Sequence, residues 1–330
     1  MLDSESNNLP FKLRSKTIKR SVALMLLALV AIYGIVPNLH EFFGLNFHLL
    51  LPKHWPELIA ALFLFYLTFF FSTLSYSFLA IRRIKRFEIF LIQLASTTLN
   101  LMLPVGIGNI SANYLFLRRK QLSQTTAGLV VGLNNALGVA GNVTLLIVLL
   151  AAFGINHPIL NIFGKHKELL ILVMLLALLL LMSIMLFLSS AFSLARHLRR
   201  DLSKALGRYS EFRRWHRIVG AYGCALAQAA ITAFVFWLSL KAFRINIDYP
   251  IAYLIYALSA LIGGFFPTPG GLGGVEASLV AGIVAVHASD TALALSAVLA
   301  YRALSYWLPA FLGVAALFIA HKMRLIRLIS

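Results

Sequence analysis

Charge and cysteine are both scarce in this sequence. Only 12% of the 330 residues are charged, and the single cysteine, Cys224, excludes a disulfide framework. The eleven acidic residues include no D-x-D or D-D pair, and the nine histidines show no metal-ligand spacing. A metal-dependent lipid-phosphate transferase requires such a cluster. We therefore expect no metal, no other cofactor and no enzymatic activity.

Apolar residues dominate the chain instead. Hydrophobic residues make up 60% of it, and the mean hydropathy is +0.87. The uncharged runs long enough to cross a membrane are 58–81, 121–164, 169–195, 218–240 and 249–275. A hydrocarbon core of about 30 Å takes about 20 helical residues. The fold class we expect is therefore an all-α polytopic membrane protein.

The basic residues, which give a formal net charge of +18, are grouped along the chain. The groups are 12–20, 82–86, 118–120, 196–217 and 322–327. Such clusters in alternate loops are typical of the cytoplasmic side of a membrane, and we expect no nucleic-acid partner. We predict a basic cytoplasmic tail at 1–17, cytoplasmic N- and C-termini, and a location in the cell (inner) membrane.

The first apolar stretch, 21–36, follows the basic tail as the core of a signal peptide would. It has no convincing small-residue cleavage site, and Pro37 follows it directly. We therefore expect a retained helix.

Two apolar stretches carry the same Gly/Pro-rich motif. Residues 104–112 read PVGIGNISA and residues 269–277 read PGGLGGVEA, so both fit P-x-G-[IL]-G-x-[IV]-x-A. Pro and Gly interrupt helices, and a pair of such breaks in corresponding positions of two halves points to a transporter substrate site. The residues predicted to break the helices are Pro104, Gly106, Gly108, Pro267 and Pro269.

All the basic groups fall on one side of the membrane only if the interrupted segments, 87–117 and 249–287, each enter and leave by the same side. We therefore predict one transmembrane domain, 18–330, built as an inverted repeat of helix, helix, re-entrant hairpin and helix. Its halves are at about 18–153 and 168–320. Irregular backbone at membrane depth cannot face lipid, so the hairpin tips should meet near the midplane and form a site. The alternative is chance similarity between glycine-rich apolar segments.

The second break and the last apolar run resemble a known family. Residues 266–277 (FPTPGGLGGVEA), residues 300–309 (AYRALSYWLP) and Gly313 closely resemble the transmembrane domain of the lysylphosphatidylglycerol synthase/flippase family. The resemblance covers nearly the whole chain. It implies an integral membrane protein with re-entrant hairpins that is associated with moving phospholipids or lipid-linked molecules between leaflets.

Two departures from that family qualify the resemblance. No soluble aminoacyltransferase domain follows the membrane region, so we expect no synthase activity. Many relatives carry charged residues at first-half positions that are neutral in this sequence: Ile107, Asn109, Asn134, Asn135 and Gly138.

Two ionisable residues lie well inside the expected membrane region. Glu276 begins the return helix of the second hairpin, and Arg302 lies about mid-bilayer in the last crossing. Glu276 either holds a headgroup amine or caps its helix. Arg302 either binds a phosphate or forms a structural ion pair with Glu276 and hairpin carbonyls. Backbone N–H groups at Gly271, Gly273 and Gly274 would add an anion site at a helix N-terminus.

Asparagines at membrane depth offer neutral ligands in the first half. We select Asn113 and Asn135 as substrate-binding candidates, although such residues also serve as hydrogen-bonding contacts between helices. The function we expect is a lipid translocase with a midplane headgroup site. Alternatives are a membrane enzyme or accessory subunit acting on a polyprenyl-linked or glycolipid substrate, and a non-transporting partner of other membrane proteins. A lipid-modifying enzyme is a further possible partner.

Overall fold

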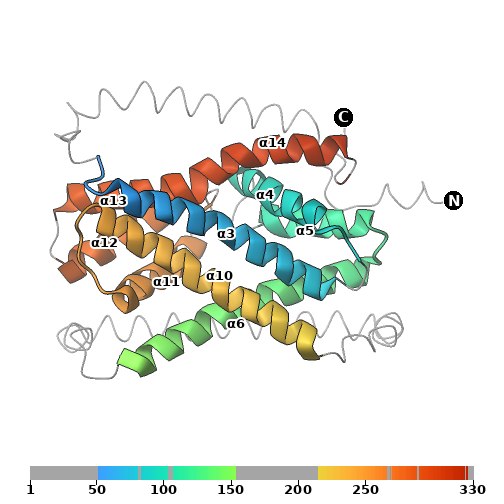
Figure 1. Cartoon of the computed structure of the whole chain (residues 1–330), viewed down its shortest axis with the longest axis horizontal. Coiled ribbons are helices and arrows are strands. Elements are labelled where there is room, and N and C mark those ends of the chain that lie inside the picture. Colours follow the sequence, from blue (N-terminus) through green and yellow to red (C-terminus); the bar gives the residue numbers. More distant parts are fainter. Residues whose placement is uncertain are drawn as a thin grey trace.

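The chain folds into helices packed side by side (Figure 1). The computed structural model describes residues 51–80, 83–102, 107–153, 215–265, 268, 270–287, 290–323 and 325, and all regular structure within them is helical. Several predicted features lie outside the described residues: the tail 1–17, the helices at 21–36 and 169–195, and the breaks at Pro104, Gly106, Pro267 and Pro269.

The helix boundaries follow the apolar runs closely. The helices of the first half are α3 (Trp55–Leu79), α4 (Arg86–Met102), α5 (Ile107–Arg119) and α6 (Gln124–Phe153). Those of the second half are α10 (Trp215–Ala242), α11 (Tyr249–Phe265), α12 (Gly274–His287), α13 (Thr291–Arg302), the π-helical turn η3 (Ala303–Trp307) and α14 (Leu308–Lys322).

Four segments of the described part are long and apolar enough to cross a membrane. They are Trp55–Leu79, Gln124–Leu149, His216–Ala242 and the continuous segment Thr291–Lys322. The prediction of an all-helical, multi-pass membrane protein is therefore confirmed.

An aspartate and a proline shape the last crossing. Asp290 precedes α13, and its side chain accepts a hydrogen bond from the Ala292 N–H at 3.1 Å, the usual role of an N-cap. Pro309 follows the π-helical turn η3. Proline has no N–H to offer the carbonyl of Ser305 four residues earlier, and a π-helical turn accommodates such a gap in a helix.

The most extensive helix contact in the described part of the chain is between α3 and α10, which lie side by side in opposite directions (Figure 1). At the start of α3, the N–H of residue 53 donates to the Ala242 carbonyl at the end of α10 at 2.9 Å. Buried alanines recur every fourth residue along α10, at Ala221, Ala225, Ala229 and Ala233. Lipid tails are as apolar as leucine, so helices in a membrane associate best where small residues let their backbones approach closely.

Each half contains two short helices that pack on each other across a Gly/Pro break, α4 on α5 and α11 on α12. In the first pair, the Asn100 side chain accepts from the Asn109 N–H at 2.9 Å near the break. At its open end, Lys120 Nζ lies 2.6 Å from Glu88 Oε2. Figure 1 shows the two pairs opening toward opposite ends of the molecule.

Gly108 differs from its predicted role. It lies inside the first turn of α5 and not in the break itself. A Cβ at this position would lie only 2.3 Å from the α4 backbone, so the residue serves close helix packing.

α4 also packs against α14 through hydroxyl and small side chains. Thr97 Oγ1 donates to the Pro309 carbonyl at 2.9 Å. Thr98 Oγ1 donates to the Ala310 carbonyl at 2.7 Å. A Cβ added to Gly313 would lie 2.4 Å from Thr98 Oγ1 and 2.5 Å from an α4 carbonyl oxygen. The contact therefore leaves no room for a larger side chain at residue 313.

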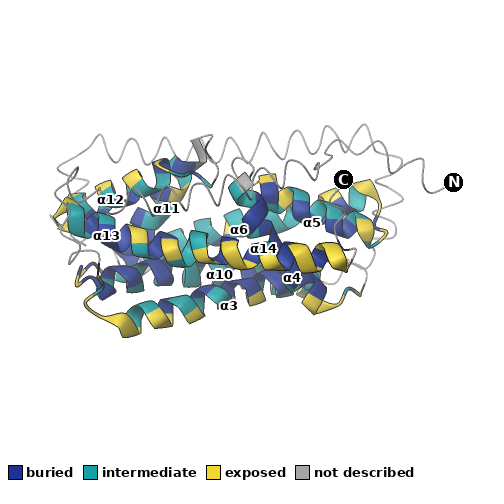
Figure 2. Cartoon of the chain, turned by 90° about the horizontal axis from the view of Figure 1, so that it is seen from above, coloured by how far each residue is buried: buried dark blue, intermediate teal, exposed yellow. Residues whose placement is uncertain are grey.

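Exposed residues lie along the outward faces of the helices (Figure 2), and many of them are large and apolar. Examples that are more than half exposed are Phe63 on α3, Ile147 on α6, Val219 on α10 and Phe318 on α14. Large exposed apolar surfaces mark contact with a membrane or a partner. Buried polar side chains, such as Gln93 and Asn113, lie inside.

We expect Gly313→Ala to lower the thermal midpoint of the detergent-solubilised protein, because the new methyl group must displace Thr98 or the α4 backbone. Overpacking of this kind costs about 1–3 kcal/mol. Gly128→Ala is the matched control, since Gly128 is exposed on α6 and an added Cβ there has nothing within 4 Å. Thermal unfolding followed by fluorescence measures both variants. Equal midpoints for the two would contradict the close α4–α14 packing.

Candidate functional site

The second Gly/Pro break contains a tight turn held by its own backbone. Gly270, Gly271 and Gly273 have φ angles of +64°, +68° and +87°, a region that glycine adopts without the penalty of a Cβ. The Gly271 N–H donates to the Thr268 carbonyl at 3.0 Å, and Thr268 Oγ1 donates to the Leu272 carbonyl at 2.9 Å. The turn thus leads directly into the first residues of α12.

Glu276 caps α12 and also reaches the last crossing. It is the third residue of the helix, and its Oε2 accepts from the Gly273 N–H at 2.7 Å. This bond from the third helical residue back to the N-cap is one half of a capping box. The other oxygen, Oε1, lies 2.5 Å from Arg302 Nε. Glu276 therefore combines helix capping with ion pairing.

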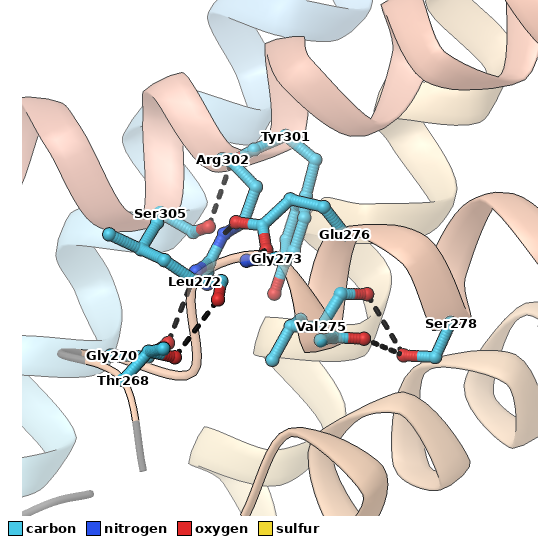
Figure 3. A network of polar contacts seen from close by, with 11 residues as sticks. Thr268, Gly270, Leu272, Gly273, Val275, Glu276, Ser278, Tyr301, Arg302 and Ser305 are labelled. Atoms are coloured by element: carbon cyan, nitrogen blue, oxygen red, sulfur yellow. Dashed lines mark hydrogen bonds and ion pairs between the residues drawn. The ribbon is translucent and has the colours of Figure 1, made fainter. Parts of the chain in front are cut away.

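Arg302, at the end of α13, ties the turn to the last crossing (Figure 3). Besides its ion pair with Glu276, Arg302 donates through Nη2 to the Gly270 carbonyl at 3.2 Å. Its guanidinium carbon lies 4.4 Å from the centre of the Tyr306 ring. The side chains of Arg302 and Glu276 are only 10% and 17% exposed. A buried arginine inside a membrane needs such partners.

Protein groups occupy two of the three backbone donors that the sequence suggested for an anion. The Gly273 N–H is bonded to Glu276, and the Gly271 N–H is bonded to Thr268. Arg302 is neutralised by the same carboxylate. In this conformation the cluster cross-links the turn, α12 and α13, and a phosphate-binding role for Arg302 stays a prediction.

A cavity of about 460 Å³, lined by both polar and apolar residues, lies between the two halves, and the Glu276–Arg302 cluster does not line it. Its walls come from α3, α5 and α6 of the first half and from α10 and α11 of the second. Its polar lining residues are Ser72, Ser75, Asn109, Asn134, Asn135, Asn142, Gln228, Thr232 and Tyr256. The other described lining residues are small or apolar.

A chain of hydrogen-bonded side chains supports the wall of this cavity. Ser72 Oγ donates to Gln93 Oε1 at 3.1 Å, and Gln93 Nε2 donates to Asn113 Oδ1 at 2.7 Å. Asn113 Nδ2 in turn donates to Asn109 Oδ1 at 2.6 Å. Asn113 is 1% exposed and does not line the cavity. It lies behind Asn109 and orients this lining residue.

Three polar side chains of the cavity are left available for a ligand. Ser75 Oγ donates to Asn134 Oδ1 at 2.7 Å. By contrast, no described residue forms a hydrogen bond with the side chains of Asn135, Gln228 or Tyr256. These side chains are partly exposed, so their polar groups are accessible to water or to a ligand in the cavity.

The sequence-selected residues thus divide between two places. The Gly/Pro turn brings together five of them: Gly271, Gly273, Gly274, Glu276 and Arg302. Asn135 lines the cavity with residues that the sequence reasoning missed, notably Gln228, Thr232 and Tyr256.

The missed residues differ in whether a sequence pattern could have identified them. Gln228 and Thr232 lie one turn apart in the apolar middle of α10, a spacing that sequence periodicity can detect. Tyr256 continues a helical spacing from Tyr249 and Tyr253, but this spacing alone does not distinguish a cavity-lining tyrosine from a packed one.

Comparison with known protein families agrees with the resemblance noted in the sequence. The family model described as the lysylphosphatidylglycerol synthase TM region matches residues 21–313. No curated protein sequence gives a significant match. The matched range contains both Gly/Pro breaks, the cavity-lining residues and the Glu276–Arg302 pair.

The effects of substituting Glu276 and Arg302 on the stability of the protein should be coupled. We expect Arg302→Gln and Glu276→Gln each to lower the thermal midpoint, because each leaves one buried charge without its partner. Breaking a buried ion pair in this way costs about 3–5 kcal/mol. The double variant should lose less free energy of unfolding than the two single variants together, with a difference of about 1 kcal/mol or more.

The exposed Lys322→Gln variant is the control for loss of a charge near the same crossing. It should unfold like the wild-type protein. Strictly additive effects of the two single changes would contradict the pairing.

Proposed function

Because the chain belongs to the lysylphosphatidylglycerol synthase transmembrane-region family, we propose that it is a lipid translocase. It moves the headgroup of a phospholipid or lipid-linked molecule between the leaflets of the cell (inner) membrane, as a transporter and not as an enzyme. The headgroup passes through the cavity between the two halves, while the acyl chains stay in the surrounding lipid.

The polar cavity is the observation that carries this proposal. A headgroup in hydrocarbon loses its hydrogen bonds to water, which is strongly unfavourable, and the amide and hydroxyl groups of the cavity replace them. The volume of about 460 Å³ lies within the range of small-molecule sites, roughly 300–1,000 Å³. Both halves contribute lining residues, as expected for a site that opens to each side in turn.

Helix length supports two re-entrant hairpins. α11 has 17 residues and α12 has 14, so at 1.5 Å per residue they extend about 26 and 21 Å. These lengths are shorter than a hydrocarbon core of about 30 Å. α4 and α5, with 17 and 13 residues, are equally short. Since each pair packs back on itself across its break, we propose that neither pair crosses the membrane.

The packing of the two halves supports an inverted repeat. α3 packs on α4 as α10 packs on α11, and α5 packs on α6 as α12 packs on α13. α4 contacts α14 as α11 contacts α6. The two hairpins open toward opposite ends of the molecule (Figure 1). Superimposing one half on the other therefore requires turning it upside down, as in an inverted repeat. Movement of one half against the other would then expose the cavity to alternate sides.

The distribution of basic residues gives the orientation. The segments at the open end of the first hairpin carry Arg83, Lys85, Arg86, Arg118, Arg119, Lys120, Arg217 and Lys322. The segments at the opposite end carry fewer basic residues, Lys53, Lys241 and Arg244, alongside Glu57, Asp248 and Asp290. Cytoplasmic loops are the Lys/Arg-rich ones, so the first end faces the cytoplasm.

Gly138→Leu tests the role of the cavity in lipid transfer. Gly138 lines the cavity, and an added Cβ there has nothing within 4 Å, so a leucine fills the space without displacing a helix. We expect normal abundance and thermal midpoint but loss of most lipid transfer. Acyl-labelled fluorescent lipids in proteoliposomes, with a membrane-impermeant quencher, measure the rate.

Gly132→Leu is the matched control on the same helix. Gly132 also has nothing within 4 Å of an added Cβ, but it does not line the cavity. It should transfer lipid at the wild-type rate. A wild-type rate of lipid transfer by Gly138→Leu would contradict the proposed path through the cavity.

The topology makes a separate prediction. In a Cys224→Ser background, we expect Ser123→Cys to react with an impermeant maleimide only from the cytoplasmic side, because it lies beside the Arg118–Lys120 cluster. Asn246→Cys, in the exposed turn after α10, should react only from outside. Right-side-out membrane vesicles, intact and permeabilised, give the comparison. Labelling of Ser123→Cys from outside would rule out a re-entrant first hairpin.

A further inference from the structure

The described lining of the cavity carries no charge, which restricts the kind of headgroup that it can hold. Its polar lining consists of hydroxyl, amide and phenol groups, and no described lining residue is acidic, basic or a histidine. The ion pair of Glu276 and Arg302 does not line it, and its two charges already neutralise each other. A charged headgroup would therefore lose water in the cavity with no counter-charge to replace it.

The three unpaired side chains supply groups for an uncharged headgroup. Asn135 on α6 and Gln228 on α10 each present amide donors and an acceptor. Hydroxyl groups both donate and accept, so they match these amides. Tyr256 on α11 adds a phenol hydroxyl and an aromatic ring, whose negative face suits the C–H groups of a sugar.

We infer that the cavity binds the uncharged, hydroxyl-rich headgroup of a glycolipid, with Asn135, Gln228 and Tyr256 as its ligands. The inference rests on the proposed lipid translocation and names the substrate class for the same cavity. The three side chains come from both halves. A bound sugar would therefore bridge the two halves and be released when they separate.

Transfer rates for three headgroups test the inference. Proteoliposomes would contain trace acyl-labelled monoglucosyl diacylglycerol, phosphatidylglycerol or lysylphosphatidylglycerol, which carry neutral, anionic and cationic headgroups. We expect the neutral glycolipid to move about tenfold faster or more than either charged lipid. Asn135→Leu and Gln228→Leu should each slow it about tenfold, the effect of one lost hydrogen bond to a ligand. Gln124→Leu, an exposed amide on α6 outside the cavity, should leave the rate unchanged.

A binding measurement separates this inference from the proposed transport. In micelles of a sugar-free detergent, monoglucosyl diacylglycerol should raise the thermal midpoint of the wild-type protein, and phosphatidylglycerol should raise it less. Asn135→Leu should keep the wild-type midpoint without lipid and lose the shift.

The outcomes distinguish the two claims. Transfer of either charged lipid at or above the glycolipid rate would overturn the headgroup class while leaving translocation in place. A glycolipid shift that depends on Asn135, without any lipid transfer, would support the binding site and overturn translocation. No transfer and no shift would overturn both.

Discussion

Polar groups that the chain carries into hydrocarbon need partners inside the protein, because lipid offers no hydrogen bonds. The turn before α12 shows how this requirement is met. Glu276 bonds the Gly273 N–H, Arg302 bonds both Glu276 and the Gly270 carbonyl, and Tyr306 covers the guanidinium. One arginine thus holds an interrupted backbone against the last crossing. The second hairpin depends on this cross-link for its position.

In the cavity, by contrast, some polar side chains have no hydrogen-bonding partner among the described residues. Around it, polar side chains satisfy each other, as in the chain from Gln93 through Asn113 to Asn109. Within it, the amides of Asn135 and Gln228 have no partner among the described residues. Because an open amide in a membrane is costly, its retention is best explained by a polar ligand that enters and leaves. We therefore propose a structural role for the charged cluster and a binding role for the cavity.

The sequence predicted the elements better than the site. Uninterrupted apolar runs defined α3 and α10 to within a few residues, since lipid contact imposes apolar composition along the entire crossing. An ion pair between Glu276 and Arg302 was among the alternatives that the sequence left open, because isolated charges are unstable in hydrocarbon. The cavity was only partly predictable. Asn135 was selected, and the spacing of Gln228 and Thr232 marks a polar face on α10. That this face, Tyr256 and Asn135 surround one space depends on the packing of α10 and α11 against α6, which no local pattern reports.

Photo-crosslinking tests most directly the central claim that a lipid headgroup enters the cavity between the halves. A glycosyl diacylglycerol with a diazirine on its sugar would be irradiated with the protein in liposomes, and the adducts mapped by mass spectrometry. We predict adducts on cavity-lining residues such as Val139 and Val143 of α6 and Ala257 of α11. Adducts confined to outward residues such as Val219 and Phe318, with none in the cavity, would contradict it.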